Sequence, residues 1–168
     1  MKLDTIKVGK IVGAHGIRGE VRVQPRDADP HMLTGFSTFL LDGQLVRPTA
    51  NHVHKNIVLM KFPGVDDMNA ALALRDKVLS IRRSDAHLPE GVYFDDELLG
   101  LDVFDADSGA RLGELVAVEP YPAHKVYTVR GEREYLIPAV PGAFIVSTDL
   151  DANRMDVHVW EGLASDEH

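Results

Sequence analysis

The sequence predicts an all-β protein made of two small β-barrel domains in tandem. Apolar and β-branched residues recur at alternate positions in short segments along most of the chain, which is the pattern of half-buried strands. The alternation stops between residues 82 and 91, where turn-forming residues gather, and the balance of charge changes sign there as well. We therefore expect domains at 1–85 and 93–168, joined by a linker at 86–92.

The first domain is expected to be a six-stranded barrel with one short helix. Its first two strands, 5–12 and 20–24, flank a glycine-rich segment and are expected to form a hairpin. The remaining strands are expected at 38–41, 45–54, 57–62 and 78–81. The helix is expected from Asp66 to Arg75, because Asp66 can cap it and the segment contains no β-branched residue.

The second domain is expected to be a small barrel or sandwich with its own apolar alternation. Turn-forming residues such as Asp107, Ser108 and Gly109 separate its candidate strands. These strands are expected at 99–106, 111–120, 125–130, 133–137, 145–148 and 154–159. Short strands at nearly regular spacing are typical of both architectures.

Composition limits the classes of function. The 168 residues include no cysteine, which excludes a disulfide framework, a zinc ribbon and a thiol nucleophile. The amino end carries charges where a signal peptide would need apolar residues, and no stretch approaches the roughly 18 apolar residues of a membrane span. We therefore expect a soluble, cytoplasmic protein with no membrane partner.

Charge is divided unevenly between the two halves. Residues 1–85 contain 13 Lys and Arg against 9 Asp and Glu, whereas residues 86–168 contain 5 against 17. This asymmetry predicts that the first half suits phosphate groups and the second a basic protein surface. The alternative is that both are ordinary solvated surfaces.

The segment between the first two strands contains Gly13, Gly16 and Gly19. A nucleotide-binding loop is disfavoured, because neither G-x-G-x-x-G nor G-x-x-x-x-G-K-[ST] is present and the segment leads into a strand rather than a helix. We expect the three glycines to shape a structural loop, since glycine reaches backbone angles that other residues avoid.

Contact with an RNA backbone is the alternative for the same loop. His15 and Arg18 lie within it, and Lys10 and Arg22 lie on the flanking strands. Cationic side chains of this kind bind phosphates through charge. These four residues are our candidates for contact with an RNA backbone.

His52 and His54 would place two imidazoles on one face of a strand, a spacing compatible with metal ligation. A third ligand cannot be named from the sequence, and a chance pair is easy among eight histidines. We therefore expect surface histidines, no metal site and no cofactor.

The densest acidic cluster, Asp95, Asp96 and Glu97, follows two adjacent aromatic residues, Tyr93 and Phe94. Catalytic carboxylates would need a pocket and an orienting group, and the chain contains no known catalytic motif. We expect no catalytic residue. The aromatic pair is either packed in the core or an anchor for a protein partner, and we predict the anchor, with Asp95 and Asp96 beside it.

Residues 8–23, VGKIVGAHGIRGEVRV, resemble the amino-terminal signature of the RimM family of ribosome maturation factors, in which a glycine-rich loop joins two strands. Residues 88–94, LPEGVYF, and residues 135–140, YLIPAV, resemble landmarks of the PRC-barrel domain that follows in that family. Phe94 stands where the family often has a second tyrosine. The resemblance implies a PRC barrel as the second domain.

The resemblance also implies a function. Such a factor binds immature 30S subunits, associates with small-subunit ribosomal protein number nineteen, and assists head assembly and 16S rRNA processing without cleaving RNA. We expect a monomeric assembly chaperone that is not an enzyme. The alternatives are a metal-dependent RNA-processing hydrolase using Asp95, Asp96 and a histidine, and a PRC-barrel adaptor unrelated to ribosomes.

Overall fold

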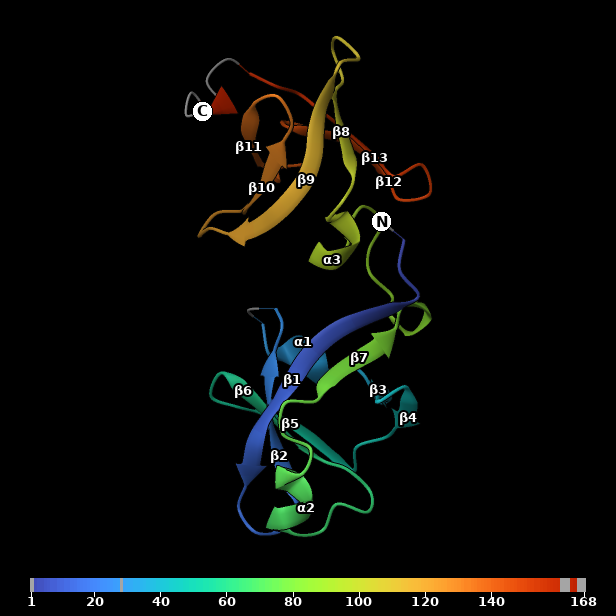
Figure 1. The fold of residues 1–168 in the computed structure, drawn as a ribbon, viewed down its shortest axis with the longest axis vertical. Coiled ribbons are helices and arrows are strands. Elements are labelled where there is room, and N and C mark those ends of the chain that lie inside the picture. Colours follow the sequence, from blue (N-terminus) through green and yellow to red (C-terminus); the bar gives the residue numbers. More distant parts are fainter. Residues whose placement is uncertain (1, 28, 161–163, 166–168) are drawn as a thin grey trace. The chain divides into compact units, whose positions relative to one another are not determined.

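The computed structural model describes residues 2–27, 29–160 and 164–165, and it divides into two compact units (Figure 1). The amino-terminal unit runs from Asp4 to His87, and the carboxy-terminal unit contains the chain from Leu88 onward. Each unit is built mainly from β-strands, so the expected all-β class with two domains is confirmed. The border between the units falls inside the expected linker at 86–92, and the exact limits of that linker stay a prediction.

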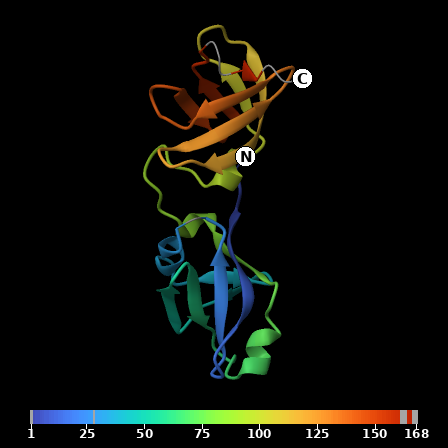
Figure 2. The same ribbon diagram turned by 90° about the vertical axis from the view of Figure 1, so that its left-hand side faces the viewer.

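The amino-terminal unit contains one antiparallel sheet of seven strands in the order β4-β3-β7-β1-β2-β6-β5. The strands are β1 (Thr5–His15), β2 (Glu20–Pro25), β3 (Phe39–Leu41), β4 (Gln44–Val46), β5 (Ala50–His54), β6 (Ile57–Lys61) and β7 (Val78–Arg82). The long β1–β2 hairpin lies at its centre (Figure 2).

The six strands predicted for this unit are therefore one too few. The segment predicted as a single strand at 45–54 is divided into β4 and β5, with Pro48 between them. Proline has no backbone N–H to donate to a neighbouring strand, so the pairing stops there. The other five predicted strands are present, with β1 three residues longer than expected.

The prediction of a single helix in this unit is also wrong, because the unit has two short helices and one 3₁₀ turn among its described residues. The predicted helix is present as α2 (Met68–Leu72), but it is capped by Asp67 rather than Asp66, since Asp67 Oδ1 accepts a hydrogen bond from Ala70 N at 2.7 Å. A helix α1 (His31–Thr34) and a 3₁₀ turn η1 (Arg83–Asp85) were not expected. Asp29 precedes α1 and accepts a hydrogen bond from the His31 backbone N–H at 2.9 Å, which is the local turn that an aspartate side chain commonly forms two residues ahead.

The carboxy-terminal unit begins with α3 (Asp95–Leu98) and continues as a seven-stranded sheet in the order β12-β13-β8-β9-β10-β11-β14. The strands are β8 (Asp102–Asp105), β9 (Arg111–Pro120), β10 (Lys125–Arg130), β11 (Glu134–Pro138), β12 (Ile145–Asp149), β13 (Arg154–Val157) and β14 (Ala164–Ser165). The β8–β13 pair is parallel and the others are antiparallel. The expected strands 111–120 and 125–130 match β9 and β10 in full.

Each unit has its own set of buried apolar residues. Alternation along β1 and β2 buries Ile6, Val8, Val21 and Val23 in the amino-terminal unit. The core of the carboxy-terminal unit is formed by Leu98, Leu101, Val103, Leu115, Val129, Ile137, Met155 and Val157. In the part of the chain that the structure describes, no helix has the length and apolar character needed to cross a membrane.

Candidate functional site

The loop between β1 and β2 is shaped by two of its glycines. Gly16 and Gly19 have φ angles of 70° and 96°, in the left-handed region that favours glycine. A Cβ atom at Gly19 would lie 2.0 Å from the Val65 carbonyl oxygen, so the loop meets the segment before α2 backbone to backbone. Gly13 instead lies inside β1, has no positive φ, and would place a Cβ in open space. The loop role predicted for three glycines therefore has a geometric basis only at Gly16 and Gly19.

Lys61 holds the segment against which Gly19 packs. Its Nζ donates hydrogen bonds to the carbonyl oxygens of Phe62, at 3.2 Å, and of Val65, and it lies 2.9 Å from Asp66 Oδ1. Lys61 on β6 and the segment that leads to α2 therefore support the loop. Helix α2 itself lies beside the loop in both views (Figures 1 and 2).

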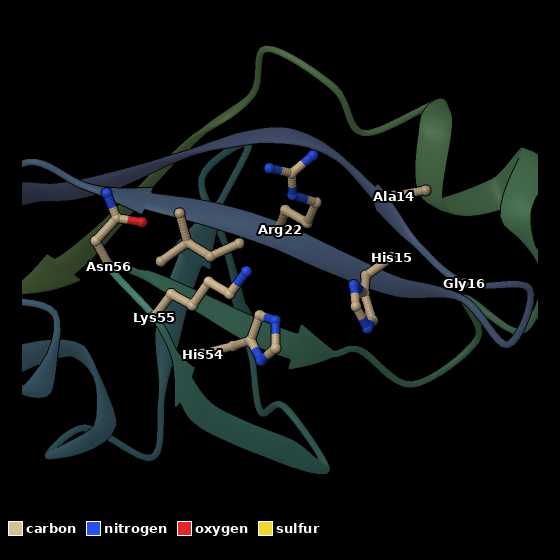
Figure 3. Close-up of a pocket in the computed structure, with 8 residues that line it drawn as sticks. Ala14, His15, Gly16, Arg22, His54, Lys55 and Asn56 are labelled. Atoms are coloured by element: carbon tan, nitrogen blue, oxygen red, sulfur yellow. The ribbon is translucent and has the colours of Figure 1, made fainter.

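A pocket of about 290 Å³ opens beside this loop, and we call it the histidine pocket. It is lined by Ala14, His15, Gly16, Arg22, His54, Lys55, Asn56 and Ile57 (Figure 3). The rings of His15 and His54 lie 5.7 Å apart between centroids, with an interplanar angle of 54°. Among the described residues that line the pocket, none is Asp or Glu. The pocket therefore combines positive charge with several hydrogen-bond donors.

Three chain segments bring these side chains together. His15 is the last residue of β1, and Arg22 is an exposed position on β2 between the buried Val21 and Val23. His54 and Lys55 come from the β5–β6 turn, where Lys55 takes a φ of 58°. Because β6 pairs with both β2 and β5, this turn is carried to the hairpin.

A second pocket of about 330 Å³ lies on the same hairpin, and we call it the lysine pocket. Its lining residues are Lys7, Gly9, Lys10, Gln24, Pro25, Arg26 and Val78. Lys10 Nζ lies 3.8 Å from Asp76 Oδ1, and both side chains are mainly exposed. An exposed ion pair at this distance is weak, so the ammonium group stays available to another anion.

The four predicted RNA-contact residues are thus not all in one place. His15 and Arg22 line the histidine pocket, and Lys10 lines the lysine pocket. Arg18 is exposed in the loop and lines neither pocket. Lys55 and Asn56 also line the histidine pocket, although neither was among the predicted contacts.

His52 and His54 are both exposed on β5. Within the described residues, no group of three or more His, Cys, Asp or Glu side chains is arranged to hold a metal ion. His54 instead faces His15 across the histidine pocket.

The predicted partner-binding residues lie at the start of the carboxy-terminal unit. Tyr93 is half-buried against the core of this unit, and its hydroxyl donates to the Thr148 carbonyl oxygen at 3.3 Å. Phe94 is only 8% exposed. The two rings lie before α3 and outside any strand, so strand alternation does not decide which of them is exposed. Tyr93 retains more accessible surface than Phe94.

The three acidic residues of α3 have different environments. Asp95 Oδ1 accepts a hydrogen bond from Lys125 Nζ at 2.8 Å, and Asp96 is partly exposed. Glu97 is 1% exposed, and its Oε1 accepts a hydrogen bond from the Phe94 backbone N–H at 3.0 Å. Glu97 stands at the third helical position as in a capping box, but Phe94 has no side-chain oxygen to complete that motif, so the local sequence carries little signal for this role.

The charge of Asp95 also affects the titration of Tyr127 on β10. Burial raises the pKa of the Tyr127 hydroxyl, and the negative charge of Asp95 raises it further. Ionising the phenol would place a second negative charge near Asp95 in a poorly solvated position. The carboxylate of Asp95 thus binds Lys125 and raises the pKa of Tyr127, both within the carboxy-terminal unit.

Comparison with known proteins covers nearly the whole chain. The RimM N-terminal domain matches residues 6–86, and the RimM PRC barrel domain matches residues 95–163. The ribosome maturation factor RimM of Symbiobacterium thermophilum is 36% identical over 170 residues, covering 97% of this chain and 96% of that protein. The protein of the same name from Acetivibrio thermocellus is 34% identical over 172 residues, covering 96% and 97%. A solved structure from Pseudomonas aeruginosa that carries the RimM name is 30% identical, covers 94% of this chain and 98% of that one, and gives a TM-score of 0.45.

Proposed function

Because this chain belongs to the RimM family of ribosome maturation factors, we propose that it binds immature 30S subunits through small-subunit ribosomal protein number nineteen. In doing so it assists assembly of the 30S head and processing of 16S rRNA, as a cytoplasmic assembly chaperone. The observation that carries the proposal is the opposite charge of the two halves: 13 basic against 9 acidic residues in 1–85, and 5 against 17 in 86–168.

The acidic unit is the part suited to a ribosomal protein, because proteins that pack against RNA are generally basic. Charge complementarity of this kind raises the rate of association and excludes competing polyanions. Tyr93 offers a half-buried aromatic ring beside Asp95 and Asp96, which is the usual composition of an interface anchor with a polar rim. Phe94 is almost fully buried and so offers less surface to a partner than Tyr93 does.

The basic unit faces the RNA in this arrangement. Lys10, His15, Arg18 and Arg22 are the candidate contacts, and three of them line pockets on the β1–β2 hairpin. Contacts of this kind add affinity for any nearby phosphate without reading sequence. Recognition of the subunit then comes mainly from the protein contact.

The protein acts by binding and needs no catalytic step of its own. The hydrolase alternative would use Asp95 and Asp96, yet Asp95 is engaged by Lys125. Release from the mature subunit follows if maturation removes or covers the favoured surface, because a binder shifts an equilibrium only through differential affinity.

Co-sedimentation with purified immature and mature 30S subunits tests the proposal. We expect the wild-type protein to sediment with the immature subunits and to bind isolated ribosomal protein number nineteen directly. The variant Tyr93→Ala should lose affinity for that protein while remaining folded, with only a small loss of stability. Equal binding to both kinds of subunit, or processing of precursor rRNA by the purified protein alone, would contradict it.

A further inference from the structure

We propose that the histidine pocket and the lysine pocket are neighbouring phosphate subsites that bind one single strand of RNA along the outer face of the β1–β2 hairpin. The inference deepens the proposed function, on which it rests for the identity of the polyanion. It adds Lys7, Gln24, His54, Lys55 and Asn56 to the candidate contacts.

The chemistry of the two linings is that of a polyanion site. The histidine pocket presents the guanidinium of Arg22, the ammonium of Lys55, the amide of Asn56 and two imidazoles. The lysine pocket presents Lys7 and Lys10 together with the amide of Gln24. Neither lining, among the residues that the structure describes, includes an Asp or a Glu.

The pleat of β2 places the two pockets next to each other. Val21 and Val23 are buried, so Arg22 and Gln24 both point to the outer face of the hairpin. Successive residues on one face of a strand are about 7 Å apart. Arg22 lines one pocket and Gln24 the other, and Lys10 is the cross-strand partner of Gln24. One strand of nucleic acid therefore reaches both pockets without a change of direction.

Two carboxylates lie close to the pockets but outside their linings. Asp76 Oδ1 is 3.8 Å from Lys10 Nζ, and Glu20 is the cross-strand partner of His15. Arg22, His54 and Lys55 all line the histidine pocket (Figure 3), whereas neither Asp76 nor Glu20 does. A phosphate there would meet donors from two different strands and a turn.

The shape and polarity of the pockets favour a nucleic-acid strand over a small molecule. Their volumes of about 290 and 330 Å³ are at the lower limit for pockets that enclose a small ligand, which commonly run from about 300 to 1,000 Å³. Each pocket suits one group of a longer polymer. The tilted rings of His15 and His54 also offer the aromatic surface on which unpaired bases stack.

The test uses the full chain and a fluorescein-labelled twelve-nucleotide oligouridylate, with binding followed by fluorescence anisotropy over a range of salt concentrations. Arg22→Gln/Lys55→Gln and Lys7→Gln/Lys10→Gln should each weaken binding on the order of tenfold. Each pair should also reduce the slope of log affinity against log salt by about 0.7 for each phosphate contact removed. Combining the two pairs should weaken binding further than either alone.

Arg47→Gln/Arg75→Gln is the matched control, because it removes the same charge from two exposed positions of this unit that line neither pocket. We expect the control to bind within about twofold of wild type. Equal loss in the control and the pocket variants would overturn the inference in favour of net charge alone. Wild-type binding by both pocket variants, or equal competition by polyglutamate, would overturn it as well.

Binding to ribosomal protein number nineteen, measured in the same variants, separates the two proposals. Pocket variants that lose oligouridylate binding but keep the protein contact support the inference. If the wild-type chain fails to bind the ribosomal protein while the oligouridylate pattern holds, the proposed function fails and the phosphate subsites stand. The reverse result would remove the subsites and leave the proposed function in place.

Discussion

The two units use charge in different ways. On the amino-terminal unit, Arg22 and Lys10 are exposed side chains on the outer face of a hairpin, and each lines a basic pocket. In the acidic cluster of the carboxy-terminal unit, Glu97 is buried to hold a backbone N–H and Asp95 is held by Lys125. The net charge counted from the sequence therefore overstates the negative charge that this acidic cluster exposes to a partner.

The largest effect should follow from a change that breaks the basic unit through its loop. Gly19→Val adds a β-branched side chain at a φ of 96°, with its Cβ 2.0 Å from the Val65 carbonyl oxygen. Strain and overpacking together should lower the free energy of unfolding by about 4 kcal/mol or more. Urea unfolding of the full chain, followed by circular dichroism, measures the loss.

Gly13→Val is the matched control for this prediction. Its Cβ would meet nothing within 4 Å and its φ is not positive, so unfolding should change by less than about 1 kcal/mol. Gly16→Val, with a φ of 70° but open space, should fall between the two. Equal effects at Gly13 and Gly19 would mean that the close approach to Val65 carries no weight.

The next effect distinguishes the two aromatic rings of the acidic unit. Phe94→Ala should lower the free energy of unfolding by about 3 kcal/mol, because the ring is 8% exposed. Tyr93→Ala should instead lower affinity for ribosomal protein number nineteen by about 2 kcal/mol, roughly thirtyfold, with a smaller loss of stability. Melting curves and binding isotherms on both variants separate the roles. If binding falls only where folding falls, the pair belongs to the core and the partner surface lies elsewhere.

A smaller effect tests the structural role of Glu97. Glu97→Ala leaves the Phe94 backbone N–H without its acceptor and should cost about 1–2 kcal/mol of stability. Glu97→Gln keeps an oxygen acceptor and should restore most of that stability. Thermal unfolding of the two variants measures the difference. A Gln variant as unstable as the Ala variant would show that the negative charge, rather than the hydrogen bond, matters at this position.

The smallest effect concerns the titration of Tyr127. Its pKa is raised by burial and then by Asp95, so the neutral phenol favours the fold. This contribution is fully present below the ordinary pKa of tyrosine and is lost as pH rises through the folded value. Asp95→Asn should bring the pKa of Tyr127 down towards its ordinary range without reaching it. Ultraviolet titration of the phenolate, with Tyr127→Phe as the reference, checks the direction, and an unchanged titration would contradict it.

Much of the fold could be predicted because strand alternation is a local property. The strands at 111–120 and 125–130 matched β9 and β10 in full, since their side chains alternate and turn-forming residues flank them. The errors also have local causes. Pro48 divided one predicted strand, and helices of four residues such as α1 and α3 are too short to show helical periodicity.

The sequence by itself determined the two-domain all-β class, the family and the division of charge, because these depend on composition, period-two patterns and contiguous motifs. Only the tertiary structure decided which charged groups act together. His54 and Lys55 lie far from His15 and Arg22 along the chain, and they meet because β6 pairs with both β2 and β5. Likewise, Glu97 is buried whereas Asp95 and Asp96 are partly exposed, although the three residues are adjacent in the sequence. Strand order and burial arise from contacts between distant segments, and no short stretch of sequence contains them.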